Sequence, residues 1–192
     1  MSEFHPERGD AAVQKDGRHR RGALRLAHAG LGSLLIGLAS QPAAAQMAGC
    51  TTVAGNVGQT VVRCRHVTIE VARGADAGLV DDNGDGAPDA VELKAGAVYI
   101  EDESQGGGRR FQVQTPHAVA SVRGTTWAVD VTAQQSAVFV ETGRVGVSRL
   151  RGGRGVVLGP GEGVDVRPGT TPLVVTRWGA PRVRALLARF GR

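Results

Sequence analysis

The segment 81–92 carries oxygen-bearing side chains at the spacing that a hard cation requires. It follows the calcium-loop pattern D-x-[DN]-x-[DN]-G-x5-E without a gap and adds an aspartate at the ninth position. Calcium takes about six to eight oxygens, and a glycine at the sixth position permits the sharp turn of the loop. We therefore expect a structural calcium site. Its ligands would be the side chains of Asp81, Asn83, Asp85, Asp89 and Glu92 and the backbone carbonyl of Ala87.

The flanks of this loop differ from those of the EF-hand, whose loop it resembles. Residues 74–78 are rich in glycine and alanine, and the chain after Glu92 has the character of a turn and a strand. Pro88 has no N–H at the position where paired EF-hand loops bond to each other. We expect one loop on a β scaffold that binds calcium weakly, with a Kd of about 10⁻⁴–10⁻³ M. The alternative is an acidic, solvated turn without metal.

The sequence contains no recognisable catalytic motif. After residue 45 the histidines are His66 and His117, and neither belongs to a nucleophile or metalloprotease motif. We therefore predict a protein that is not an enzyme.

Residues 1–45 have the organisation of a cleavable signal peptide. Four arginines between Arg18 and Arg25 precede an uncharged apolar run at 29–39, and an A-x-A pattern ends at Ala45. This run is too short to span a bilayer, which needs about 20 residues. We expect a mature chain that begins at Gln46 and is periplasmic or secreted.

Two cysteines, Cys50 and Cys64, follow the expected cleavage point. In an oxidising compartment such close cysteines predict a disulfide bond. The alternative is a lipid on Cys50, because residues 47–50 resemble a lipoprotein signature. That alternative would leave Cys64 as a free thiol outside the cell, so the disulfide is favoured.

The body of the chain alternates short β-branched runs with glycine-rich turns. Apolar residues recur with period two, as at 126–132, where Trp127 would be the largest core side chain. The pattern predicts an all-β sandwich or roll of short antiparallel strands with a short C-terminal amphipathic helix. The expected strands are 60–65, 67–72, 97–102, 110–114, 119–123, 126–132, 137–141, 144–150, 155–158, 163–166 and 173–177.

The C-terminus has a helical period instead. Val183, Leu186, Leu187 and Phe190 form one apolar stripe, and Pro181 suits the first turn of a helix. We expect this helix to dock on the β body. The alternative is peripheral contact of this basic helix with an anionic membrane or a partner.

The net charge of +5 does not indicate a nucleic-acid partner, because the charges are segregated. Acidic residues gather at 76–103, whereas residues 173–192 hold five arginines and no acid. Neither an aromatic stacking platform nor a zinc-ligand spacing accompanies the arginines. We expect four regions: a signal peptide at 1–45, a disulfide-closed segment with the first strands at 46–75, a β domain with the acidic loop at 76–172, and a final strand and helix at 173–192.

Five segments follow one another between residues 91 and 166: LKAGAV (93–98), FQVQTPHA (111–118), VRGTTWAV (122–129), VFVETGRVGV (138–147) and LGPGE (158–162). The patterns F-x-V-x-T-P-x-A and V-R-G-T, in this order, resemble the FecR domain, the periplasmic module of iron-citrate signalling regulators. The resemblance implies an all-β domain that contacts or senses other proteins without catalysis. The motif residues could equally serve the fold, with Arg123 expected to pair with Asp130 or Glu141.

FecR regulators carry a sigma-factor-binding region and a membrane span before this domain. Here a short segment without helical periodicity precedes the apolar run. This departure from the regulators' pattern favours a free-standing, exported interaction module whose partner is an unidentified envelope protein. The alternatives are a periplasmic component of an anti-sigma pathway and a structural domain anchored to the envelope.

Overall fold

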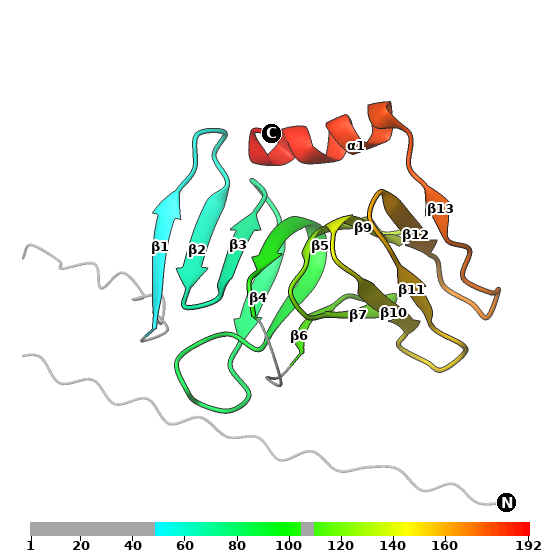
Figure 1. Cartoon of the computed structure of the whole chain (residues 1–192), viewed down its shortest axis with the longest axis horizontal. Coiled ribbons are helices and arrows are strands. Elements are labelled where there is room, and N and C mark those ends of the chain that lie inside the picture. The colour runs from blue at the N-terminus through cyan, green and yellow to red at the C-terminus, as the bar shows by residue number, and fades with distance from the viewer. Residues whose placement is uncertain (1–48, 105–109) are drawn as a thin grey trace, which may run out of the picture. The chain divides into compact units, whose positions relative to one another are not determined.

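The computed structural model describes residues 49–104 and 110–192, so the predicted signal peptide lies outside the described residues. In this part, thirteen strands precede one α-helix and a short 3-10 helix (Figure 1). The predicted all-β class with a C-terminal helix is confirmed. The elements are β1 Cys50–Ala54, β2 Thr60–Cys64, β3 Val67–Val71, β4 Asp76–Val80, β5 Ala90–Asp102, β6 Phe111–Gln114, β7 Ala118–Val122, β8 Thr126–Val131, β9 Ser136–Thr142, β10 Val145–Arg149, β11 Val156–Leu158, β12 Glu162–Val166, β13 Thr176–Arg177, α1 Ala180–Leu187 and the 3-10 helix Ala188–Phe190.

Strand β5 organises the fold because it belongs to two sheets. Its N-terminal half pairs with β4 and, in parallel, with β6, while its C-terminal half pairs with β3 and β8. The first sheet runs β1-β2-β3-β5-β8-β9-β12-β13, and the second runs β4-β5-β6-β7-β10-β11. The other strand pairs of the described residues are antiparallel, so the β5–β6 pair is a parallel exception within the predicted antiparallel sandwich.

Gly96 marks the point where β5 passes from one sheet to the other. Its φ is +87°, a backbone conformation that is strained for residues that carry a side chain. A Cβ atom on Gly96 would also lie 2.6 Å from the Cα of Ala75. The glycine of the LKAGAV segment is therefore required by the fold.

The two sheets pack their apolar faces together to form the main core. Trp127 is fully buried there, as predicted, and Ile69, Leu93 and Ile100 are buried with it. Most of the remaining core side chains are valines, which suit a pleated surface.

Helix α1 covers the other face of the first sheet and closes a second, smaller core. Four alanines of the sheet and its connections leave room for the aromatic side chains: Ala72, Ala97, Ala128 and Ala137. Phe190 lies with its ring centre 5.7 Å from that of Tyr99, and Trp178 stacks on Phe139 at 5.2 Å. Leu186 and Phe190 are buried, so the apolar stripe of the helix is occupied within the molecule.

Arginines of the C-terminal segment fasten it to the sheet. Arg189 pairs with Asp130 at 2.5 Å and Arg192 pairs with Glu70 at 2.5 Å. Glu141 accepts a hydrogen bond from the hydroxyl of Tyr99 at 2.7 Å; burial and then this bond raise the pKa of Tyr99. Asp130 and Glu141, the acids suggested for Arg123, thus contact Arg189 and Tyr99. The pairing of Arg123 itself stays a prediction.

Two strands have no counterpart among those expected from the sequence, and another is shorter. Strand β1 is mostly exposed, and in β4 Ala77 and Leu79 are only partly buried against the main core, so the apolar alternation of both strands is weak. The segment 173–177 forms a strand only at Thr176–Arg177, while Leu173 and Val175 pack against the main core without pairing. No described helix has the length and apolarity needed to cross a membrane.

Candidate functional site

The acidic segment 81–89 is the loop of the β4–β5 hairpin, so it connects two strands as predicted and not two helices. The backbone N–H of Asp89 donates to the carbonyl of Val80 at 2.8 Å and closes the base of the loop. Gly84 and Gly86 adopt φ values of +73° and +84°, which supply its turns.

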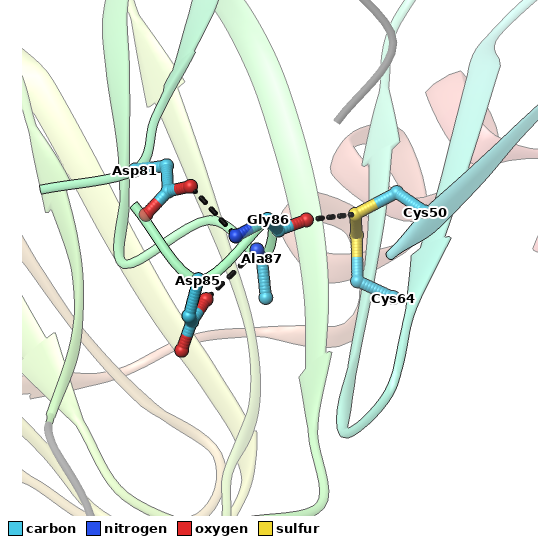
Figure 2. Close-up of a disulfide and its surroundings, with 6 residues drawn as sticks. All are labelled: Cys50, Cys64, Asp81, Asp85, Gly86 and Ala87. Atoms are coloured by element: carbon cyan, nitrogen blue, oxygen red, sulfur yellow. Dashed lines mark hydrogen bonds between the residues drawn. A yellow bond between two sulfur atoms is a disulfide. The ribbon is translucent and has the colours of Figure 1, made fainter. Parts of the chain in front are cut away.

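Side chains of the loop bind its own backbone. The two carboxylate oxygens of Asp81 accept hydrogen bonds from Gly84 N at 2.7 Å and Gly86 N at 2.9 Å. Asp85 likewise accepts from Ala87 N at 2.9 Å (Figure 2). The hydrogen bond from Gly86 is the largest cause that lowers the pKa of Asp81. Asp81 is therefore an anion at neutral pH.

The expected calcium ligands do not form a finished cation site. Asp89 lies across the loop from the first ligand positions, where it accepts hydrogen bonds from Asn83 Nδ2 at 3.4 Å and Asp82 N at 3.1 Å. Glu92 is exposed on β5, opposite Gly78 of β4. Within the described ranges, no three Asp, Glu, His or Cys side chains converge as metal ligands. Asp81, Asn83, Asp85, Ala87 and Asp89 share the loop, while Glu92 stands beyond it on the strand.

The acidic loop rests against a disulfide bond between Cys50 and Cys64. These residues face each other across the β1–β2 pair, with their Cα atoms 4.3 Å apart. The carbonyl of Gly86 accepts a hydrogen bond from Gly49 N at 3.1 Å and lies 3.7 Å from Cys50 Sγ (Figure 2). A disulfide sulfur carries no hydrogen, so the second approach is a packing contact. Because this sulfur is bonded to Cys64, it is not available for the lipid of the alternative interpretation.

The T-P-x-A segment forms the turn between β6 and β7. Thr115 is buried, and its Oγ1 accepts hydrogen bonds from Ala118 N at 2.9 Å and from the Ser136 hydroxyl at 2.8 Å. The same hydroxyl donates to the carbonyl of Ala118 at 2.9 Å. Each bond satisfies a polar group that burial would otherwise penalise, so this threonine serves the fold.

The R-G-T segment forms a second turn, in which Thr125 is buried while Arg123 and Gly124 are exposed. Asp102, at the end of β5, accepts a hydrogen bond from Gly124 N at 3.1 Å and donates its own N–H to Thr125 O at 3.0 Å. The hydroxyl of Thr125 reaches the carbonyl of Arg144 at 3.2 Å. Gly124 has a φ of +61°, which favours glycine. The hydrogen bonds of this motif therefore join β5, β8 and β10.

Both turns fall within a stretch that comparison with known proteins identifies. Residues 68–146 match the family model described as FecR protein. The chain contains a FecR domain. The match runs from β3 into β10 and includes the acidic hairpin and the T-P-x-A and R-G-T turns. The predicted resemblance is thus confirmed.

Two solved structures are similar to the chain that holds this FecR domain. Both are crystal structures titled "putative anti-sigma factor" from Parabacteroides distasonis ATCC 8503, at 2.50 Å and 1.65 Å resolution. Each is 21% identical to this chain, with a TM-score of 0.47. The similarity covers 72% of this chain and spans 60% of the length of the solved chains. No curated protein matches the sequence.

The FecR domain contains one contact that resembles part of a hydrolase site. His117 Nδ1 lies 2.9 Å from Ser136 Oγ. Ser136 is fully buried and donates its hydroxyl proton to Thr115, so it is not placed to attack a substrate. His66, the other histidine after residue 45, is exposed in the β2–β3 turn. These positions agree with a family whose role is regulatory.

Proposed function

We propose that this chain is an exported, non-catalytic interaction module of the bacterial envelope. The observation that carries the proposal is the FecR match over residues 68–146, because proteins of this family act through contacts with other proteins. The disulfide between Cys50 and Cys64 supports export, since such bonds persist in oxidising compartments. Export would occur through the signal peptide, with cleavage after Ala45. The partner is an envelope protein.

A second candidate function is a periplasmic component of an anti-sigma or iron-type signalling pathway. It is favoured by the regulatory role of FecR proteins. The structural alternative, an envelope-anchored domain, would use the arginines of residues 180–192. Because α1 packs its apolar stripe on the first sheet, anchoring through that stripe would require the helix to leave its groove.

The test is to express the full chain in a Gram-negative host and recover it by osmotic shock. We expect an N-terminus at Gln46 and, after cross-linking in intact cells, one specific envelope protein identified by mass spectrometry. A sigma regulator or an outer-membrane receptor as that protein would select the signalling function. Retention on anionic vesicles that is lost on deleting residues 180–192 would select the anchored domain. Cytoplasmic material that still begins at Met1 would contradict export, and the absence of any specific cross-link would contradict the interaction module.

We also propose that the acidic hairpin binds calcium as a structural ion. The spacing of the side chains in residues 81–92 supports this proposal, as does the ionised state of Asp81 at neutral pH. Binding would exchange backbone hydrogen bonds of Asp81, Asn83 and Asp85 for bonds to the ion and would draw Glu92 toward the loop. The ion would thereby stiffen the contact of the loop with the disulfide at Gly86.

Thermal unfolding with calcium and with chelator tests this site. At about 10 mM calcium and a Kd of about 10⁻⁴–10⁻³ M, binding to the folded state alone stabilises it by about 1.4–2.7 kcal/mol. The melting temperature should then rise by roughly 3–10 °C. Glu92→Gln should abolish most of this rise, while Glu103→Gln, an exposed carboxylate outside the loop, should retain it. An unchanged melting temperature in the wild type, or an equal rise in the Glu92→Gln variant, would refute the site.

A further inference from the structure

Three loops that are distant in sequence line a cleft of about 520 Å³. They are the β6–β7 turn, the loop that follows β10 and the segment that follows β12. Loops at one end of a β scaffold are common sites of recognition. The volume of the cleft lies within the range of ligand pockets, about 300–1,000 Å³.

The lining of this cleft is basic. Arg149, Arg151 and Arg167 contribute to it together with His117, and no carboxylate does. Asp165, two residues before Arg167 in the sequence, forms an ion pair with Arg182 of α1 at 2.5 Å. None of the three lining arginines forms an ion pair within the described residues. The positive charge of the cleft is therefore not neutralised from within this part of the chain.

Hydrogen bonds hold the cleft in shape before any ligand binds. The guanidinium of Arg149 donates to the carbonyls of Arg167 and Thr171 and so ties the last loop to the end of β10. Arg167 donates from Nε to Gln135 Oε1 at 3.1 Å, which leaves its Nη groups without a partner in the described residues. Arg151 makes no hydrogen bond there and is exposed. Arg149 thus builds the cleft, while Arg151 and Arg167 are able to bind.

The hydrogen-bond chain behind the cleft determines which nitrogen of His117 carries a proton. Thr115 donates to Ala118 O, so Ser136 donates to Thr115 Oγ1. Ser136 Oγ must then accept from His117 Nδ1–H. Nε2 remains as the ring nitrogen that can meet a ligand.

Part of the lining is apolar, and this selects among anions. Leu150 lies between two of the arginines in the sequence and is 50% exposed, and Pro116 and Pro168 line the same cleft. A sulfate, a phosphate or a sugar polyanion would make no use of this surface. A peptide that carries carboxylates next to an apolar side chain would use both parts.

We propose that this cleft binds an acidic segment of a partner protein, whose carboxylates meet Arg151 and Arg167 and whose apolar side chain covers Leu150. The proposal deepens the interaction function given above and rests on it. Arg–carboxylate pairs provide charge-assisted hydrogen bonds with defined geometry, which gives the site its preference for a carboxylate-bearing chain.

Fluorescence anisotropy of the purified, exported protein tests this. The probe is a short fluorescein-labelled peptide in which glutamates alternate with leucine and serine. We expect saturable binding that weakens with salt and falls about tenfold in the double variant Arg151→Glu/Arg167→Glu, because two exposed ion pairs are lost and repulsion replaces them. The variant Arg73→Glu/Arg184→Glu changes the net charge equally at exposed arginines that do not line the cleft, and it should bind as the wild type does.

Four results would overturn the proposal. These are wild-type affinity in Arg151→Glu/Arg167→Glu, an equal loss in Arg73→Glu/Arg184→Glu, full affinity for a peptide with serine in place of leucine, and tighter binding of a sulfated polysaccharide or anionic vesicles than of the peptide. The wild type could also self-associate in analytical sedimentation. If Arg151→Glu/Arg167→Glu abolished that self-association, the occupant of the cleft would be a second copy of the chain and not a different protein. Cross-linking in intact cells distinguishes a failure of the cleft proposal from a failure of the interaction function. If Arg151→Glu/Arg167→Glu captures the same envelope protein as the wild type, the cleft is wrong and the interaction module stands. If neither captures one, the module itself is wrong.

Discussion

Replacing Trp127 by alanine is expected to lower the free energy of unfolding by about 3–5 kcal/mol. Trp127 is the largest fully buried side chain of the main core, on β8 between Ile100 of β5 and Val140 of β9. Alanine would leave a cavity between the two sheets that the paired strands cannot collapse to fill. Stable domains of this kind have about 5–15 kcal/mol in total, so the variant should unfold at much lower urea concentration.

The matched control for this cavity is phenylalanine. The indole Nε1 of Trp127 is buried without a hydrogen-bond acceptor in the described residues. Trp127→Phe removes that unsatisfied donor and keeps an aromatic ring, so it should lose less than half as much stability as Trp127→Ala. Urea unfolding followed by far-ultraviolet circular dichroism measures both variants. Equal losses in the two, or a loss below about 1.5 kcal/mol in the alanine variant, would contradict the role of Trp127 in the core.

Removing the disulfide by Cys50→Ser/Cys64→Ser is expected to cost about 3 kcal/mol, or roughly 6–12 °C in melting temperature. The bond joins residues 14 positions apart, and the chain-entropy model assigns this stabilisation to a loop of that size. It also anchors β1, an exposed strand whose only pairing in the described residues is with β2. Loss of the bond should therefore loosen β1 and its contact with the acidic loop at Gly86.

Reduction provides the control for the disulfide prediction. Dithiothreitol should destabilise the wild type to the level of the double serine variant and leave that variant unchanged. Limited proteolysis should cut near β1 in the reduced wild type and in the variant, and spare the oxidised wild type. A variant as stable as the wild type would contradict the prediction, as would a further fall of the variant in dithiothreitol.

The acidic hairpin illustrates how far spacing in a sequence can predict a site. The sequence places Asp81, Asn83, Asp85 and Asp89 in one loop, and the fold keeps them there. The same sequence puts Glu92 within the ligand pattern, while strand pairing with β4 and β6 places it on an extended backbone beyond the loop. Local spacing defines which oxygens are available, and the strand register defines how far they lie from one another.

The alternation of β-branched residues and glycines was sufficient to predict most strands, because side-chain period and turn conformation are properties of a few consecutive residues. Trp127 as a core residue, the C-terminal amphipathic helix and the cysteine pair follow from the sequence for the same reason. Strands β1 and β4 do not, since each buries few apolar side chains and is held largely by pairing with a neighbouring strand.

What the tertiary structure decided is which distant segments meet. Asp130 binds Arg189, 59 residues away, because the C-terminal helical segment packs on the first sheet. The bend of β5 at Gly96 assigns its two halves to different sheets. The arginine-lined cleft is built from three loops that pattern alone leaves unconnected. Contacts of this kind depend on strand order and register, which result from the packing of the whole chain and leave no local signal in any one segment.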